Sequence, residues 1–403
     1  MSFDPTHPNA PAATAIPDIL FVAVGGAGIK LISHLPRRVP ELRYAAIDSD
    51  AQSLEQCPFE DKVLLLPAKT GGLGTGSNPD LGREGAEAMD DRWLQLLEPC
   101  RVVILVAGLG GGTGGGAGPY LAERALDYGK IVLAAVVKPL EAEGGHRRHA
   151  ADAALSRYRE ICHAVSLFPL DAMREDAQMP LQRLISRCGL EVARAIGGLA
   201  VLLRTGWLVP LTLMDMVQVM RRAQGYCRLA AVSADGEDRL TRVLEQLFSH
   251  PLLDQGSLLA HSGGVILGIL CGPNATIGEL ETISREVRAV LRAEAELKIG
   301  IAQDERFGRY LGLVVMVAER WSTPILPEEA AAEEEPAGSV EGGTGEQTGR
   351  DTRLIQSEIN LAVEVKGRFK GATPTIVEGA DLDTPTFIRK GIRLSQRTYR
   401  SGS

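Results

Sequence analysis

Seven of the nine residues from Gly108 to Gly116 are glycines, and only Leu109 and Thr113 interrupt them. Glycine reaches backbone conformations that are closed to other residues, and it lets a ligand approach the main chain closely. A loop of this kind that opens a helix presents free N–H groups and the positive end of the helix dipole, which together bind phosphate. The residues expected to cradle a phosphorylated ligand are Gly110, Gly111, Gly112, Thr113, Gly114 and Gly115.

A second, shorter glycine motif, Gly25–Gly28, follows an apolar run at residues 18–24. Asp48 comes twenty residues after Gly28, at the end of the next apolar run. A carboxylate at this place binds ribose in dinucleotide-binding proteins, so this region alone leaves a nicotinamide-dependent oxidoreductase open. The further glycine loops count against that alternative, because a dinucleotide site has no use for them. The long box also lacks the Gly-Lys-Ser/Thr ending of a P-loop.

The elements that must position these loops alternate between strands and helices. Buried-strand patterns are followed by glycine loops and then by helix-like runs, which predicts an α/β fold with a mostly parallel sheet. In such sheets ligands bind at the carboxyl ends of the strands. A helix at 182–204 is apolar nearly all round and is expected to lie buried between two domains. The strands are predicted at 18–24, up to Asp48, 61–67, 101–107, 130–138, 226–232, 264–271, 297–302 and 311–318.

The composition restricts the classes of function. The chain has 403 residues and a formal charge of -8, which argues against broad nucleic-acid binding because that needs a basic face. Its six cysteines form no C-x-x-C pair and are expected to be buried thiols. The N-terminus has neither a basic start nor an apolar run, and no apolar stretch reaches the length of a membrane span. These features predict a cytoplasmic protein without direct membrane insertion.

The glycine box and four segments around it resemble the tubulin/FtsZ family. "GLGGGTGGGAGP" is close to the family signature, whose core is GGGTG followed by a small residue and glycine. In chain order, "FVAVGGAG", "AIDSDAQSL", "GGLGTGSNPDLGREGAE" and "VVKPLEAEGGHRR" resemble the family's first phosphate loop, ribose-side loop, terminal-phosphate loop and sugar loop. "DGEDRL", "SHPLLD" and "GGVILGIL" look like parts of the FtsZ C-terminal domain, and "DLDTPTFIRK" at 381–390 looks like the partner-docking motif of many FtsZ tails.

This resemblance implies a nucleotide site for GTP or GDP with Mg²⁺. The residues that it adds to the glycine box are Gly25, Gly26, Ala27, Gly28, Asp48, Asp50, Gly74, Thr75, Gly76, Asn78, Glu143 and Arg147. Two of the neighbouring residues keep local alternatives. Asn78 before Pro79 is an expected helix N-cap, and Arg83 forms either a contact to the terminal phosphate or an i,i+4 ion pair with Glu87.

The resemblance also implies the domain plan of the tubulin/FtsZ fold. A Rossmann-like parallel-sheet GTPase domain is expected at 18–181, a central helix at 182–204 and a second α/β activation domain at 205–321. A flexible extension at 1–17, an acidic disordered linker at 322–351 and a tail at 352–403 complete the plan. Subunits of this family stack head to tail, and the activation domain of one subunit completes hydrolysis on the nucleotide of its neighbour.

Two places depart from the family pattern. The acidic loop of FtsZ reads Asn-x-Asp-Phe-Ala-Asp, and an ungapped match places Pro210 at the Asn, Thr212 at the first Asp and Asp215 at the second. Loss of one carboxylate weakens the positioning of water. As a lone residue, Asp215 either keeps a catalytic role or acts only as a helix-start carboxylate.

The second departure lies on the central helix. The same match places Leu190 where the family has the Asp that binds the guanine edge, and Glu191 is turned about 100° from that position. Either the match slips here or guanine selectivity is reduced. The phosphate apparatus is thus complete while the base-reading and catalytic groups are reduced. We therefore predict an FtsZ-like protein that binds GTP, forms head-to-tail filaments with itself and hydrolyses slowly. The alternative is a non-hydrolysing scaffold that co-assembles with a catalytic FtsZ, and an adaptor is expected to bind 381–390.

Overall fold

The computed structural model describes residues 19–33, 35, 42–203, 208–223, 226–319, 376–377 and 380–381. The chain divides into two compact units, residues 1–330 and 331–403. Within the described residues, the second unit consists of a short antiparallel hairpin of β11 (Ile376–Val377) and β12 (Ala380–Asp381). The predicted extension at 1–17, the predicted linker and the tail motif, apart from Asp381, lie outside these residues.

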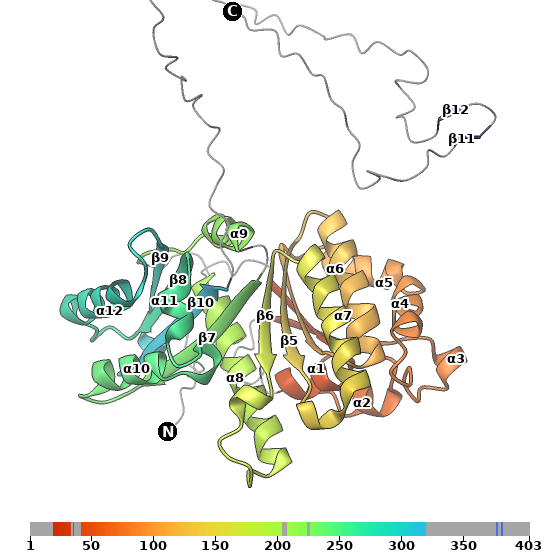
Figure 1. Ribbon diagram of the computed structural model, residues 1–403, viewed down its shortest axis with the longest axis horizontal. Coiled ribbons are helices and arrows are strands. Elements are labelled where there is room, and N and C mark those ends of the chain that lie inside the picture. The colour runs from red at the N-terminus through yellow and green to blue at the C-terminus, as the bar shows by residue number, and fades with distance from the viewer. Residues whose placement is uncertain are drawn as a thin grey trace, which may run out of the picture. The chain divides into compact units, whose positions relative to one another are not determined.

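In the described part of the first unit, ten strands form one sheet in the order β3-β2-β1-β4-β5-β6-β7-β10-β8-β9 (Figure 1). The neighbours from β3 to β7 are all parallel, whereas β10 is antiparallel to both β7 and β8. The strands are β1 (Ile19–Val24), β2 (Arg43–Asp48), β3 (Asp61–Leu64), β4 (Val102–Gly108), β5 (Ile131–Lys138), β6 (Ala164–Pro169), β7 (Tyr226–Ala234), β8 (Gly264–Cys271), β9 (Glu296–Gln303) and β10 (Leu311–Ala318). The predicted α/β class with a mostly parallel sheet is confirmed.

Strand β6 is the strand that the sequence analysis misses. Its residues, Ala164–Pro169, form a short run with a serine in the middle and a proline at the end, and such runs carry a weak strand signal. β6 pairs with β5 along its length and with β7 through Val165–Tyr226 and Ser166–Cys227. This one strand therefore joins the half of the first unit that contains β1 to β5 with the half that contains β7 to β10, so that they form one continuous sheet.

Helices cover both faces of the parallel part of the sheet (Figure 1). Alternate residues of β1 show this directly, because Phe21 belongs to the core on one face and Val22 to the core on the other, and both are fully buried. The helices of the first half are α1 (Gly25–Ile32), α2 (Ala51–Glu55), α3 (Pro67–Thr70), α4 (Pro79–Glu87), α5 (Asp90–Leu97), the π-helical turn η2 (Thr113–Ala117), α6 (Gly118–Asp127), η3 (Glu141–Glu143), α7 (Gly145–Ile161) and η4 (Asp171–Met173).

Helix α8 (Leu181–Leu202) confirms a helix at the predicted place and lies between the two halves of the ribbon (Figure 1). Its part from Val192 onward is mostly buried, whereas Leu181 and Ile185 in its first turns are exposed, so the expected burial holds only for the C-terminal part. Its 22 residues span about 33 Å. Its packing is tight, since a Cβ built on Gly198 would lie 2.5 Å from Cγ2 of Val314 in β10. The remaining helices are α9 (Leu213–Arg222), α10 (Arg239–Phe248), η5 (Pro251–Leu253), α11 (Ser257–His261), α12 (Ile277–Val290) and η6 (Glu305–Phe307).

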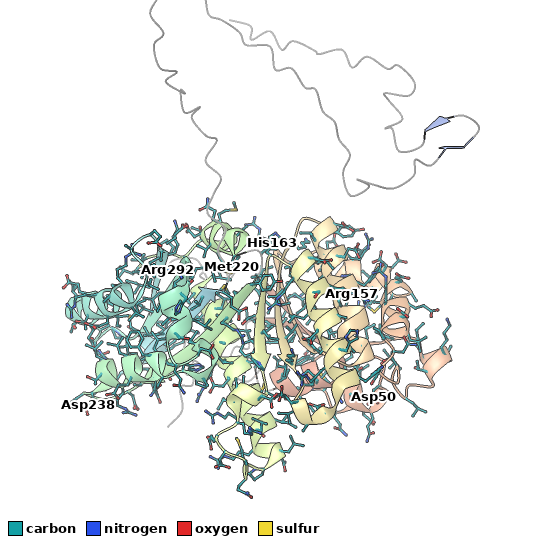
Figure 2. The ribbon with its side chains drawn as sticks, viewed as in Figure 1. Asp50, Arg157, His163, Met220, Asp238 and Arg292 are labelled. Carbon is teal, nitrogen blue, oxygen red and sulfur yellow. The ribbon has the colours of Figure 1, made fainter. Side chains whose placement is uncertain are left out.

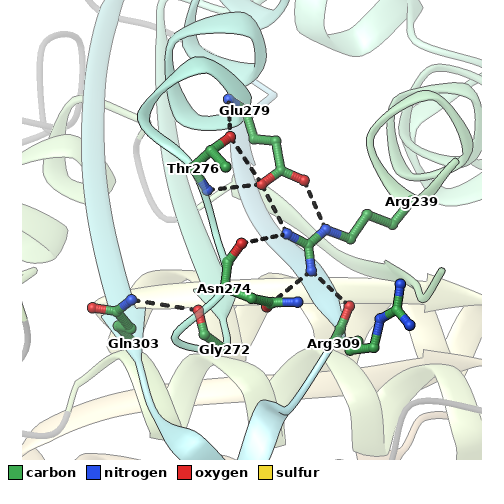
Figure 3. A network of polar contacts seen from close by, with 7 residues as sticks. All are labelled: Arg239, Gly272, Asn274, Thr276, Glu279, Gln303 and Arg309. Carbon is green, nitrogen blue, oxygen red and sulfur yellow. Dashed lines mark hydrogen bonds and ion pairs between the residues drawn. The ribbon is translucent and has the colours of Figure 1, made fainter. Parts of the chain in front are cut away.

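A buried arginine ties the second half together (Figure 3). The guanidinium of Arg239 donates to both carboxylate oxygens of Glu279, at 2.7 and 2.8 Å. It also donates to the side chain and carbonyl of Asn274 and to the carbonyl of Arg309. Glu279 in turn forms a capping box with Thr276 at the start of α12. One side chain of α10 thus fixes α12 and the loop before β10.

The six cysteines are all buried and free, as expected from the sequence. Burial raises the pKa of Cys188 and of Cys227 to about 12, so neither thiol is activated as a nucleophile. Among the helices of the described residues, none combines the length and the apolar character that a bilayer crossing requires.

Candidate functional site

The two glycine motifs meet at the carboxyl edge of the parallel sheet. β1 and β4 are neighbours, with Val24 in register with Ala107, and each glycine motif follows directly where its strand ends. Gly25 has a φ of +76°, and a Cβ built on it would lie 3.4 Å from Cβ of Thr113. The first loop therefore packs on the glycine box, as the prediction of one shared ligand site requires.

Asp48 lies beneath this junction and holds Thr113. Its Oδ1 accepts hydrogen bonds from the Ser49 N–H at 2.7 Å and from Thr113 Oγ1 at 3.3 Å. The hydroxyls of Ser49 and Thr113 are 2.7 Å apart. Ser49 is not among the site residues expected from the sequence, although its place between two aspartates at a strand end is a signal that points to it. Thr113, expected as a phosphate donor, is thus held in place by the ribose-side loop.

The second oxygen of this carboxylate, Oδ2, is buried and has no hydrogen-bond partner among the described residues. Asp48 is 3 % exposed, and burial raises its pKa above the ordinary value, against the opposing effect of the Ser49 hydrogen bond. A carboxylate oxygen left without a partner beside a phosphate cradle fits a bound cation or a donor supplied by a ligand. Both oxygens of Asp50, by contrast, are used locally: Oδ1 accepts from the Gln52 N–H at 2.9 Å and Oδ2 from the Ser53 hydroxyl at 3.0 Å, so Asp50 is the N-cap of α2.

The glycines of the box do two different things. A Cβ built on Gly112 would lie 2.2 Å from Thr75 Oγ1, one on Gly114 would lie 2.2 Å from the Gly108 carbonyl oxygen, and one on Gly116 would lie 1.8 Å from the Pro79 carbonyl oxygen. These three glycines allow η2 to pack against its surroundings. A Cβ on Gly111, by contrast, meets no atom within 4 Å. Gly116 lies outside the residues expected to bind the ligand, whereas Gly112 and Gly114 belong to them and also allow close packing.

The third glycine loop, residues 71–78, is fastened to the ribose-side loop. Gly74 N–H donates to the Ser49 carbonyl oxygen at 3.0 Å, and Leu73 forms an isolated bridge with Asp50. Gly74 and Gly76 both have positive φ, at +87° and +57°. This loop thus reaches the same edge of the sheet as the two glycine motifs.

The end of this loop starts α4. The side chain of Asn78 accepts from the N–H groups of Asp80 and Leu81, which confirms the predicted N-cap. Arg83 Nε lies 2.8 Å from Glu87 Oε1, so the local ion pair is the alternative that forms.

Arg147 also lies against the glycine box. A Cβ built on Gly110 would come within 2.7 Å of Cγ of Arg147 and 2.8 Å of its carbonyl oxygen. Arg147 Nε is 3.1 Å from Glu143 Oε2, and Glu143 Oε1 accepts from the Leu140 N–H. The predicted sugar loop therefore lies next to the glycine box. The side chain of Arg147 is half exposed and forms an ion pair with Glu143.

Leu190 stands on α8 at the position that the sequence match gives to the guanine-binding Asp, and the one acidic residue of this helix is the adjacent Glu191. Gly189 faces α1, since a Cβ built on it would lie 3.5 Å from the Leu31 carbonyl oxygen. Glu191 is turned away and lies 3.4 Å from Arg194 and 3.5 Å from His250. In this structure the Glu191 carboxylate is therefore engaged on the side of α8 that faces Arg194 and His250.

Both residues expected in the acidic loop lie at the start of α9, and both are engaged there. Thr212 Oγ1 donates to Asp215 Oδ2 at 2.5 Å and accepts from the Asp215 N–H at 3.0 Å, and Asp215 Oδ2 also accepts from the Thr212 N–H. Asp215 Oδ1 is 3.3 Å from Lys298 Nζ. The Thr212 hydrogen bonds and the nearby Lys298 hold the Asp215 pKa below its ordinary value. Lys298, on β9, was missed because nothing in its local sequence connects it with Asp215.

The acidic loop and the glycine loops lie at opposite edges of the sheet. α9 ends just before β7, and β7 is parallel to β6, so α9 lies at the amino edge of the parallel strands. Figure 2 shows the same separation, with Met220 of α9 at the top and Asp50 at the lower right. Asp215 of one chain therefore cannot reach the glycine loops of that chain.

Comparison with known proteins gives matches to two family descriptions: "Tubulin/FtsZ family, GTPase domain" over residues 18–178 and "FtsZ family, C-terminal domain" over residues 225–319. Cell division protein FtsZ 1 of Thermococcus kodakarensis is 30% identical over 343 residues, covering 85% of this chain and 88% of the relative. Its counterpart in Archaeoglobus fulgidus is 29% identical over 310 residues, covering 76% and 83%. A solved FtsZ dimer of M. jannaschii has a TM-score of 0.67 at 26% identity, covering 75% of this chain and 88% of that one.

Proposed function

The chain belongs to the tubulin/FtsZ family of GTPases, and we propose that it binds GTP at the carboxyl edge of its sheet and assembles head to tail into filaments that hydrolyse GTP slowly. The observation that carries the proposal is the separation of the glycine loops from the acidic loop within one chain. Surfaces at opposite ends of a subunit associate heterologously, which generates a filament. Asp215 then meets the nucleotide of the neighbouring copy.

The described residues support distinct roles at the nucleotide. The N–H groups at the start of η2, with the open space over Gly111, suit the phosphates. Arg147 beside Gly110 suits the sugar or a phosphate, and Asp48, whose buried Oδ2 has no partner among the described residues, suits the cation or a donor of the nucleotide. Mg²⁺ bound with GTP neutralises phosphate charge. Because Leu190 offers no acceptor to the guanine edge, discrimination between GTP and ATP is weaker than a carboxylate there would give.

Slow hydrolysis follows from the state of the acidic loop. Oδ2 of Asp215 accepts a hydrogen bond from Thr212 at the start of α9, and Oδ1 forms an ion pair with Lys298. Its lowered pKa makes it a weak base toward water. The loop thus offers little of the water positioning that hydrolysis needs.

Replacing Thr212 with aspartate is expected to raise phosphate release from assembled protein by at least about tenfold, because a second carboxylate joins Asp215. Aspartate is also a good N-cap, so α9 keeps its start. The measurement is phosphate release per polymerised subunit. Thr212→Ser keeps the cap without adding charge and should match the wild type, whereas equal rates in Thr212→Asp and wild type would contradict this reading of the loop.

The proposed function is tested by incubating the full chain with GTP and Mg²⁺ and recording light scattering and phosphate release together, with ATP and GDP as controls. The expected result is scattering with GTP, little with GDP and slow phosphate release. Brisk release would show that Asp215 suffices for hydrolysis. Absence of both polymer and bound guanine nucleotide would refute the proposal.

The second candidate function is a non-hydrolysing scaffold that co-assembles with a catalytic FtsZ. The capping of Asp215 by Thr212 favours it, because that contact is complete within the chain and leaves no carboxylate free. Co-pelleting with a catalytic FtsZ, together with no turnover in Thr212→Asp, would select this candidate. An adaptor at 381–390, which would recruit the protein to a membrane surface, stays a prediction because the motif after Asp381 lies outside the described residues.

A further inference from the structure

A cavity of about 480 Å³ lies between α8, β7, α10 and the turns η4 and η5. None of its lining residues belongs to the glycine loops or to the acidic loop. Its volume falls within the range of small-molecule sites in proteins. Part of its wall is apolar and is formed by Met173, Val232 and Leu252 among others. The cavity thus has the size and the mixed wall of a ligand site.

The charged part of the wall is unbalanced. Arg187, Arg194 and Arg242 line the cavity, and Glu191 is the one carboxylate among the lining residues. The acids that pair with two of the arginines, Glu175 at 2.6 Å from Arg187 and Asp235 at 3.9 Å from Arg242, are not part of the lining. Three guanidinium groups and one carboxylate therefore face the cavity, although Glu175 and Asp235 compensate the charges of Arg187 and Arg242 from outside it, and guanidinium groups are the donors that an anion needs.

Two donors of the wall are poorly used. Arg194 reaches Glu191 with Nη1 at 3.4 Å, but its Nε is buried and has no hydrogen-bond partner among the described residues. His250 is 7 % exposed, and its Nδ1 accepts from the Leu252 N–H, which places the ring proton on Nε2, 3.5 Å from Glu191 Oε2. His250 thus faces Glu191 at long range and Arg194 Nε has no acceptor among the described residues, and a buried donor without an acceptor costs free energy.

We propose that this cavity binds a small anionic molecule, whose phosphate or carboxylate group is held by Arg194 and Arg187 and whose apolar part packs on Met173, Val232 and Leu252. The planar fork of arginine matches both anions, and a phosphate offers it more acceptors and more charge. The site is separate from the nucleotide site of the proposed function. Because its walls come from α8 and from the β7–α10–η5 side, the ligand contacts both halves of the first unit.

The test is calorimetric titration of the full chain with phenyl phosphate, benzoate and benzyl alcohol, with and without saturating GDP. Phenyl phosphate and benzoate separate phosphate from carboxylate recognition, and benzyl alcohol lacks the charge. We expect phenyl phosphate to bind more tightly than benzoate, benzyl alcohol not to bind, and GDP to leave these results unchanged. Displacement of phenyl phosphate by GDP would place it in the glycine loops and overturn the proposal, whereas failure of GDP itself to bind would count against the proposed function alone.

Two variants act in opposite directions on the cavity. Glu191→Gln removes its one carboxylate and should strengthen phenyl phosphate binding several-fold, a gain that misfolding cannot produce. Arg194→Gln should weaken binding about tenfold. Arg92→Gln, which removes an exposed arginine paired with Asp61 outside the cavity, should leave the affinity unchanged. No binding of phenyl phosphate at millimolar concentration, or equal affinity in all three variants, would overturn the proposal.

Discussion

Replacing Gly116 with alanine is expected to lower the free energy of unfolding by about 3 kcal/mol and to abolish nucleotide binding. The new Cβ would lie 1.8 Å from the Pro79 carbonyl oxygen and 2.7 Å from its carbonyl carbon, which is a collision with backbone that no rotamer relieves. Relief requires η2 to move away from the start of α4, and the N–H groups that we propose to bind the phosphates belong to η2. Urea denaturation gives the stability change, and titration with a fluorescent GDP analogue gives the loss of binding.

Gly111→Ala is the matched control because it adds the same methyl group within the same box. A Cβ on Gly111 meets nothing within 4 Å, so its stability should stay within about 0.5 kcal/mol of the wild type. Its nucleotide affinity should still fall, because the open space over Gly111 is where the phosphates are expected. A Gly111→Ala protein that binds GDP as tightly as the wild type would move the phosphates elsewhere along the loop.

Replacing Arg239 with methionine is expected to cost about 3–5 kcal/mol of stability. The change keeps much of the side-chain volume but leaves the mostly buried carboxylate of Glu279 without its partner, and it removes the hydrogen bonds to Asn274 and Arg309 (Figure 3). The measurement is urea denaturation at pH 7. Arg285→Met breaks an exposed pair with Glu286 on the neighbouring helix α12 and should change stability by less than about 1 kcal/mol.

The same network predicts how this difference depends on pH. Arg239 holds the pKa of Glu279 below its ordinary value of 4.5. A group whose pKa is lowered by folding contributes stability above its unfolded pKa, and that contribution is lost as the pH falls through the folded value. The gap between wild type and Arg239→Met should therefore be full near pH 7 and narrow below about pH 4. A stability difference between wild type and Arg239→Met that increases in acid would show that the ion pair with Glu279 does not account for the stabilisation by Arg239.

Much of the fold could be predicted because its signals are local. The apolar run before Gly25, the glycine box before Gly118 and the apolar surface of the helix at 182–204 depend on residues close together in the chain. Nine of the ten strands carry such a signal, and Asn78 before Pro79 is a local cap. Strand β6 could not be predicted because its short run is stabilised as a strand by pairing with β5 and β7, and β7 begins more than fifty residues later.

The candidate site divides in the same way. The sequence by itself determined which loops carry glycine and that Glu191 is turned from the Leu190 position, because helix geometry sets that angle. It also predicts, through an ungapped match, that Thr212 and Leu190 stand where the family has carboxylates. Only the tertiary structure decided that Gly116 serves packing while Gly111 faces open space, that Lys298 pairs with Asp215, and that Arg194 shares a cavity wall with Arg242. These contacts join residues far apart in the chain, and they are set by the order and register of the strands, which no local pattern specifies.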